Sequence, residues 1–346
     1  MISYNEKYWE DTERVIAHIP DIERLYGKKI LITGATGMIC SAVTEILLHL
    51  NKVHKADIKI ILAGRSEERI KKRFYASEYG KDYFYIYFDA TDNFEFHEQV
   101  DYIIHGASNA TPATYTSQPV ETMLANLIGL HSLLKYTAEN SVSRMLYISS
   151  SEVYGCLDNK TPFEENVYGT VDILNPRNCY PNAKRTAETL CISYNQEYHT
   201  DTVIVRPGHI YGPTITDTDN RASAQFTRNA VNGENIVMKS AGLQLRSYCY
   251  TMDCASAILA VLLNGITGNA YNISNPDSVV TIRDVACALA EYAGTEVVFE
   301  NPDDTEKKGY NLMSDSSLKS EKLESLGWSA EFSLKEGIAH TVDFLK

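Results

Sequence analysis

Apolar runs alternate with amphipathic stretches along the first two thirds of the chain. The runs, each of a length that suits one strand, lie at 29–33, 57–65, 83–90, 100–108, 144–151 and 201–208. Helical periodicity fills the intervals, most clearly over 119–139 and 181–199. Continuous apolar strands are typical of a parallel sheet that helices cover on both faces. The pattern predicts an α/β fold, a Rossmann-type doubly wound parallel sheet.

The pattern loosens after Gly208, where short helical segments mix with Pro, Gly and Asn turns. We therefore expect three parts, in which the sheet domain and a smaller C-terminal lobe are interleaved. They are a charged helical lead-in at 1–27, the sheet domain at 28–206 plus about 236–273, and the smaller lobe at 207–235 plus 274–346.

Composition narrows the class of protein. The chain has 346 residues, 44% of them hydrophobic, which is enough for a sizeable core. A formal net charge of −13 disfavours nucleic acid as a partner, because phosphate-backbone binding uses clustered Lys and Arg. No apolar segment approaches the ~20 residues of a membrane helix. Seven cysteines without a CxxC pair are typical of free thiols in a reducing compartment. We expect a cytoplasmic protein with neither a membrane nor a metal partner.

A glycine-containing turn, GATGMIC, follows the first predicted strand and precedes a helical period. In that position glycines let backbone N–H groups approach a pyrophosphate at a helix N-terminus, although an ordinary βα turn is the alternative. Cys40 takes the place of the usual third glycine, and we expect a modest perturbation because its side chain is small. The sheet domain is thus expected to bind a dinucleotide through Gly34, Thr36, Gly37, Met38 and Ile39.

The nicotinamide cofactor is not fixed by the sequence. Arg65 stands after the second strand, where an acidic residue would bind the ribose diol of NAD. An Arg there can accept the 2′-phosphate of NADP, or it can simply open a charged helix. Asp89 ends the third strand and either meets the adenine amino group or forms a turn. NAD is the expected cofactor, with NADP as the alternative.

Tyr180 and Lys184 lie four residues apart and so share one face of a predicted helix. A Lys ammonium beside a phenol lowers the phenol pKa from about 10, which makes Tyr a general base for a hydroxyl proton during hydride transfer. Chance is the competing explanation, because the chain has 23 Tyr residues. Ser150, about thirty residues earlier, is expected to share the hydrogen bond to the substrate oxygen.

These motifs resemble those of the extended short-chain dehydrogenase/reductase family, whose members modify nucleotide sugars. The resemblance runs from Lys29 over almost the whole chain and includes HGAS, SSSEVYG, NPRNCYPNAKRTAET, RPGHIYGP and LRSYCYTMDCASAI. Within the family the chain is most similar to the UDP-glucuronate decarboxylases. The resemblance implies that the smaller lobe binds a nucleotide sugar, with UDP as the expected nucleotide, and that the protein is a homodimer. It adds Ala90, Ala107 and Ser108 to the cofactor-binding residues, together with Tyr180 and Lys184.

The implied reaction begins with transient oxidation of the sugar at C4, which leaves the cofactor unchanged after each turnover. Glu152 points beyond oxidation, since a simple 4-epimerase needs no acid there. In a decarboxylase the C4 ketone accepts the electrons when carbon dioxide leaves C5. In a 4,6-dehydratase Glu152 would remove the C5 proton, and a salt bridge at the strand end is the plain alternative. The alternative functions are a 4,6-dehydratase, a 4-epimerase, an NADPH-dependent ketosugar reductase, and a dinucleotide sensor without turnover.

The resemblance also implies which residues contact the substrate. The arginines match nucleotide-binding positions or could gather at the cleft between the lobes, where guanidinium groups pair with diphosphate oxygens. Ordinary ion pairs and packing are the alternatives. The segment at 306–317 holds Lys307 and Lys308 and no Arg, where the decarboxylases carry one. The expected contacts are Tyr115, Ser151, Arg177, His209, Arg221 and Arg246.

Overall fold

A single parallel sheet forms the centre of the molecule. The computed structural model describes residues 2–157, 162–301 and 313–346. Seven strands pair in parallel in the order β10-β6-β5-β4-β1-β2-β3, which confirms the doubly wound Rossmann sheet. They are β1 (Lys29–Thr33), β2 (Lys59–Gly64), β3 (Phe84–Tyr87), β4 (Tyr102–His105), β5 (Arg144–Ile148), β6 (Thr202–Pro207) and β10 (Ala270–Ile273).

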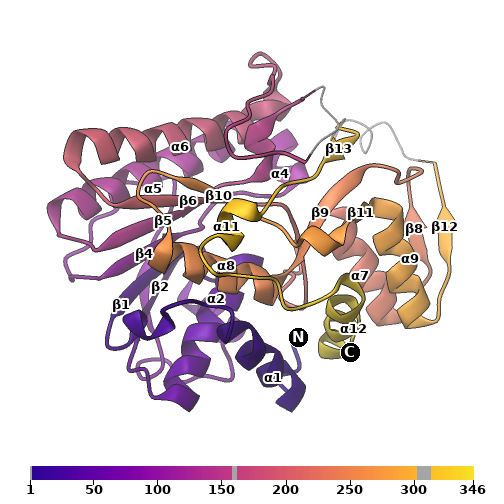
Figure 1. The fold of residues 1–346 in the computed structure, drawn as a ribbon, viewed down its shortest axis with the longest axis horizontal. Helices are drawn as coiled ribbons and strands as arrows, with labels where there is room; N and C mark the ends of the chain where they lie inside the picture. The colour runs from indigo at the N-terminus through magenta and orange to yellow at the C-terminus, as the bar shows by residue number, and fades with distance from the viewer. Residues whose placement is uncertain (1, 158–161, 302–312) are drawn as a thin grey trace.

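Helices cover both faces of this sheet (Figure 1). Successive residues of β1 point to opposite sides, so Ile30 and Ile32 join one apolar core while Leu31 joins another. The first core contains α2 and α8, and the second contains α5 and α6, each pair packed together. The helices in this part of the chain are α2 (Met38–His49), α3 (Glu67–Arg73), α4 (Pro112–Ser117), α5 (Pro119–Glu139), α6 (Cys179–Tyr198) and α8 (Thr251–Asn264).

The third strand departs from expectation. Its apolar run predicts a buried strand, but Phe84 and Tyr87 at the ends of β3 are exposed. β3 forms the edge of the sheet and pairs only with β2 along the strand order, so its side chains lack a second neighbouring strand. Periodicity alone does not distinguish an edge strand rich in aromatic residues from a central one.

The remaining strands form two small sheets beside the large one. β9 pairs with β7, β11 and β13, while β8 pairs with β12. How these elements divide between domains stays a prediction. The strands are β7 (His209–Tyr211), β8 (Ile236–Met238), β9 (Leu245–Tyr250), β11 (Val279–Thr281), β12 (Val297–Phe299) and β13 (Asp315–Ser316). The helices beside them are α7 (Ala222–Asn232), α9 (Ile282–Ala293) and α12 (Leu334–Leu345), while α11 (Glu321–Glu324) contacts β10 of the large sheet. Within the described ranges, no helix combines the length and apolarity needed to cross a membrane.

The N-terminal segment packs against the sheet domain. Helix α1 (Glu6–Ile16) contacts α2 and α8, and a short 3-10 helix (Ile22–Leu25) follows it. Glu45 of α2 is only 1% exposed and accepts hydrogen bonds from the hydroxyls of Tyr4 and Tyr8. The guanidinium of Arg73, at the end of α3, lies 2.7 Å from the same carboxylate. The lead-in is therefore joined to two helices of the sheet domain through one buried charge.

Removing Arg73 should destabilise this junction. Arg73→Met leaves the Glu45 carboxylate buried without its cation, and we expect a loss of about 3 kcal/mol in the free energy of unfolding. The double variant Arg73→Met/Glu45→Met removes both charges and should recover most of that loss. Urea unfolding followed by circular dichroism measures both. A double variant no more stable than Arg73→Met would contradict this account.

Candidate active site

Tyr180 and Lys184 lie in the first turns of α6 and are both buried. The Lys184 ammonium donates a hydrogen bond of 2.7 Å to the carbonyl oxygen of Ile148, the last residue of β5. It lies 5.7 Å from the centre of the Tyr180 ring and 4.6 Å from that of Tyr147. Four-residue spacing thus places both side chains beside the carboxyl end of a central strand, as the sequence predicts.

The Tyr180 hydroxyl stands in a group of polar and aromatic side chains. Its ring stacks on that of Tyr115, with centroids 4.5 Å apart and planes inclined by 13°. Burial, and then the charge of Glu152, raises the pKa of Tyr180 to about 12, although hydrogen bonds with Ser150 and Tyr115 and the charge of Arg221 act in the opposite direction. The expected lowering of this pKa is therefore wrong for the chain by itself.

Lys184 carries less positive charge than its spacing from Tyr180 suggests. Burial lowers the pKa of Lys184 to about 7, and the nearby charge of Glu188 offsets only part of this effect. A Lys that is half neutral near pH 7 attracts a phenolate weakly. Tyr180 and Lys184 do lie close together, as predicted. Lowering the pKa of Tyr180 nevertheless requires further positive charge in the site.

Glu152 and Arg177 reach the same place from two short helices. Glu152 lies in a 3-10 helix (Ser151–Tyr154) directly after β5, and Arg177 lies in another (Pro176–Asn178) directly before α6. The nearest oxygen and nitrogen of the pair are 3.7 Å apart. Burial raises the pKa of Glu152, and the charges of Arg177 and Arg246 oppose that rise. Among the described residues, the buried Nε of Arg177 has no hydrogen-bond partner.

Arg221 precedes α7 and reaches the glycine turn at the start of α2. Its guanidinium is held by Asp219, with Nη2 2.6 Å from Oδ2, and the same Nη2 lies 2.9 Å from the sulfur of Met38. The phenols of Tyr115 and Tyr180 lie within electrostatic range of this guanidinium. Arg221 thus faces both expected ligand sites.

Arg246 and His209 lie on the neighbouring strands β9 and β7. Arg246 donates to the carbonyl oxygens of Leu245 and Met313, at 2.7 and 2.9 Å. Burial, together with the charges of Arg246 and Arg221, lowers the pKa of His209 to about 3. Its buried Nδ1 has no hydrogen-bond partner among the described residues. A neutral His with an unused polar atom suits a contact with a polar ligand.

The glycine turn packs closely against the segment at the end of β4. Gly34 has φ +71°, and a Cβ there would lie 2.7 Å from the backbone of Gly106 and Ala107. Gly37 is the N-cap residue of α2 and has no side chain to cap the helix. The backbone N–H groups in the first turn of α2 therefore point toward the glycine loop without a side-chain partner from Gly37. These features fit a pyrophosphate at the helix N-terminus, with Thr36, Met38 and Ile39 beside it.

The Cys at the third glycine position also has a local reason. Cys40 is buried on the inner face of α2, and a Cβ added to Gly106 would lie 2.3 Å from its sulfur. Gly106, in the HGAS segment at the end of β4, therefore provides the space that the sulfur needs. Sequence reasoning noted this segment without recognising that contact.

The remaining expected cofactor residues follow the other strands. Arg65 is exposed after β2. Burial disfavours the ionised form of Asp89, but hydrogen bonds from Thr91 and then the charge of Arg65 outweigh it and lower the pKa. Asp89 thus forms a turn and also lies near Arg65. Ala107 donates its N–H to Thr33, and the hydroxyl of Ser108 bonds to Asn126.

Arg206 does not belong to this group of basic residues. Arg206 pairs with Glu188 at 2.7 Å and also donates to Tyr154, which makes it a structural residue of β6. Lys307 and Lys308 lie outside the described residues. Asp219, which orients Arg221, was missed, although its position two residues before that Arg was a usable signal.

Comparison with known proteins decides the family. The model of the NAD dependent epimerase/dehydratase family matches residues 30–274. The chain belongs to this family. It is therefore an enzyme of the epimerase, dehydratase and decarboxylase group, which confirms the resemblance in the sequence. The homodimer and the cytoplasmic location stay predictions.

Relatives within the family include named decarboxylases. The chain is 30% identical over 315 residues to UDP-glucuronic acid decarboxylase 6 of Arabidopsis thaliana, which covers 90% of this chain and 86% of that protein. It is 28% identical over 332 residues to UDP-glucuronic acid decarboxylase 1 of Xenopus tropicalis, and the alignment covers 92% of this chain and 72% of that protein.

Solved structures share the fold. A UDP-glucose 4-epimerase of Thermotoga maritima, solved with UDP-glucose, has a TM-score of 0.76 at 22% identity and covers 91% of this chain and 98% of its own. A dTDP-glucose 4,6-dehydratase of Bacillus anthracis, in complex with NAD, has a TM-score of 0.75 at 19% identity and covers 92% and 96%.

The depressed pKa of Lys184 predicts a pH-dependent stability in nucleotide-free protein. The folded-state pKa is about 7. It lies below the usual Lys pKa of about 10.4, so above pH 7 the unfolded chain holds a proton that the folded chain has released. Stability should rise with pH through this window relative to Lys184→Met, by about 1 kcal/mol per pH unit. Urea unfolding at several pH values measures the difference between the two proteins. A pH-independent difference would contradict the shift.

Proposed function

We propose that this enzyme decarboxylates UDP-glucuronate through transient oxidation of the sugar at C4, with NAD as the bound cofactor. The observation that carries the proposal is the position of Glu152, which shares its surroundings with Tyr180 and is paired with Arg177. The relatives that are named UDP-glucuronic acid decarboxylases support the choice of substrate. We also propose that residues 207–235 and 274–346 bind the nucleotide sugar.

Tyr180 and Ser150 handle the proton at C4. Tyr180 accepts the proton of the C4 hydroxyl, and Ser150 shares the hydrogen bond to that oxygen. A nicotinamide cofactor held by the glycine turn would supply the hydride chemistry at C4, and its positive charge would favour the phenolate form of Tyr180 as the base. Lys184 supports the same shift whenever it is protonated, because its ammonium lies 5.7 Å from the Tyr180 ring. The raised pKa of Tyr180 in the chain alone would keep it protonated until the site is filled.

Glu152 serves the chemistry at C5. Once C4 is a ketone, the C5–carboxylate bond breaks, carbon dioxide leaves, and the bonding electrons form an enolate. That enolate takes up one proton at C5 before C4 is reduced. Burial raises the pKa of Glu152, which keeps a protonated carboxyl more accessible near neutral pH than in an exposed acid. Glu152 is therefore suited to donate the proton.

The arginines match the charges of this substrate. Arg177 has a buried Nε without a partner in the described chain, and we assign its guanidinium to the sugar carboxylate. Arg221 and Arg246 are assigned to the diphosphate, since guanidinium groups pair with phosphate oxygens in a bidentate way. His209, Tyr115 and Ser151 complete the proposed substrate contacts.

A 4,6-dehydratase is the second candidate, and the same Glu152 favours it. A carboxylate beside Tyr180 could instead remove the C5 proton of a neutral hexose, after which water leaves from C6. The two functions differ in what the substrate carries at C5, so a comparison of substrates separates them.

Incubation with a panel of nucleotide sugars tests the function. We expect purified enzyme to convert UDP-glucuronate to a product lighter by carbon dioxide, and to leave UDP-glucose and dTDP-glucose unchanged, as read by mass spectrometry. Tyr180→Phe should reduce the rate at least about 100-fold, since it removes a general base. Loss of water from a neutral hexose would assign a dehydratase, and a stereoisomer of unchanged mass would assign an epimerase. Mass analysis of the extracted cofactor separates NAD from NADP and decides the role of Arg65.

Glu152→Gln should separate the oxidation at C4 from the protonation at C5. Because the Glu152 charge raises the pKa of Tyr180, its removal should leave the C4 oxidation as fast or faster, while turnover falls at least about 100-fold. Rapid mixing with UDP-glucuronate would then show the absorbance of reduced cofactor before any product forms. Glu291→Gln, an exposed acid on α9, is the matched control and should leave both steps unchanged. Equal losses in oxidation and turnover would refute the assigned role.

A further inference from the structure

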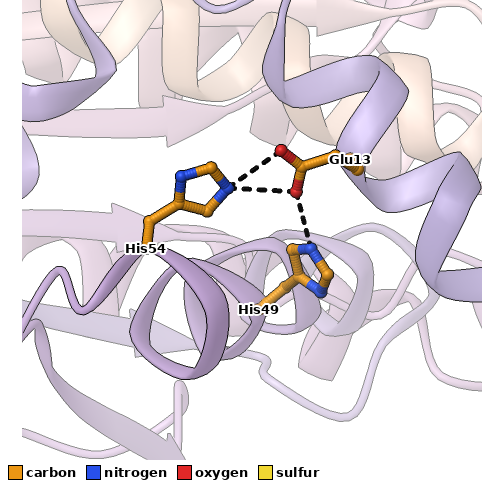
Figure 2. Close-up of side chains that lie close together, drawn as sticks. All are labelled: Glu13, His49 and His54. Carbon is orange, nitrogen blue, oxygen red and sulfur yellow. Dashed lines mark hydrogen bonds and ion pairs between the residues drawn. The ribbon is translucent and has the colours of Figure 1, made fainter.

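Three potential metal ligands meet between the N-terminal helix and the far end of α2. Figure 2 shows Glu13 of α1 directed at His49 and His54. Nε2 of His49 lies 2.7 Å from one carboxylate oxygen, and Nε2 of His54 lies 2.9 Å from the other. One donor atom from each residue falls within a group whose members are all within 4.8 Å of one another. The proposed reaction uses none of these side chains.

The backbone is shaped so that the two imidazoles face the same side. His49 is the last residue of α2, and a π-helix follows at Leu50–His54. Residues five apart on an α-helix point about 140° away from each other, since each residue turns about 100°. A π-helix instead bonds residue i to i+5, which narrows the angle between such residues and brings them toward the same side. The His49 and His54 rings are accordingly 6.3 Å apart.

The cluster has one anchored ligand and two accessible ones. His49 is 7% exposed and stacks on Trp9, with centroids 5.5 Å apart and planes inclined by 13°. The side chains of Glu13 and His54 are 47% and 32% exposed. A metal ion can therefore enter from solvent, and water can complete its coordination.

We propose that Glu13, His49 and His54 bind one Zn²⁺ ion or a divalent transition metal of similar preference. Two imidazole nitrogens and a carboxylate, with water as the fourth ligand, form a common tetrahedral zinc set. Donor atoms in such a site lie roughly 3.3 Å apart, given bonds of about 2.0–2.1 Å. The distances from the Glu13 carboxylate to Nε2 of His49 and of His54 need to lengthen by about 0.6 and 0.4 Å, and the exposed Glu13 and His54 side chains are free to adjust. Ca²⁺ and Mg²⁺ are disfavoured because they prefer oxygen ligands.

The site would join α1 to α2. Its ligands come from both helices, so a bound metal stabilises only the state in which α1 is docked. The glycine turn and the Glu13–His49–His54 cluster lie at opposite ends of α2, about 18 Å apart for a helix of 12 residues. This role is therefore structural and independent of the proposed function.

Metal titration of the tag-free full chain tests the site. After treatment with a chelator, titration with ZnCl₂ in a calorimeter should show one saturable site, and Co²⁺ should give the visible absorption of a tetrahedral centre. MgCl₂ should produce neither signal. Zn²⁺ should raise the midpoint of thermal unfolding by several degrees, as binding to the folded state requires.

Two variants and one control decide the assignment. His54→Gln and Glu13→Gln should each weaken Zn²⁺ binding at least tenfold and remove the thermal shift, while the metal-free proteins unfold close to the wild type. His97→Gln alters an exposed His outside the cluster and should bind as the wild type does. Absence of a saturable Zn²⁺ site, or undiminished binding by His54→Gln, would overturn the proposal and leave the cluster as hydrogen-bonded surface residues.

Discussion

One buried ammonium group holds the candidate site together. Lys184 donates to the carbonyl oxygen of Ile148 and so ties the first turns of α6 to the end of β5. Tyr180 lies one helical turn before Lys184, while Ser150 and Glu152 follow Ile148 within four residues. This hydrogen bond between α6 and β5 thus places the Tyr180 phenol of the helix near the Glu152 carboxylate that follows the strand. The cost of burying Lys184 appears in its pKa of about 7.

The charge around this junction opposes that of the molecule as a whole. The chain carries a formal net charge of −13, yet Arg177, Arg221 and Arg246 all act on Glu152 or Tyr180. Such local positive charge suits an anionic nucleotide sugar, whereas the acidic remainder disfavours nucleic acid. Because Asp219 restrains Arg221 and Glu152 restrains Arg177, this charge is held in place before a ligand arrives.

Helix α2 runs from the proposed pyrophosphate site to the proposed metal site. Its first turn meets the expected pyrophosphate, and its last residue supplies a ligand of the proposed metal site. Between them, Glu45 is buried beneath Tyr4, Tyr8 and Arg73. The N-terminal segment is therefore packed along α2 rather than being a detached extension, which its charged composition alone did not indicate.

The sequence by itself determined the features that depend on local order along the chain. Apolar runs predicted the strands, GATGMIC predicted the turn after β1, and the four-residue spacing placed Tyr180 beside Lys184. These follow from backbone periodicity and from the freedom of glycine, both of which are local. A single sequence could also suggest Glu152 and the arginines, through their resemblance to a family.

Only the tertiary structure decided what depends on residues distant in sequence. The direction of the Tyr180 pKa required knowing its burial and its distance from Glu152. Arg206 proved structural because Glu188 of α6 lies against it, and β3 proved an edge strand because no described strand follows it in the sheet. Glu13 meets His49 and His54 only because α1 docks on α2 and a π-helix turns both rings toward it. Burial, charge and helix docking act through space, and the linear pattern does not contain them.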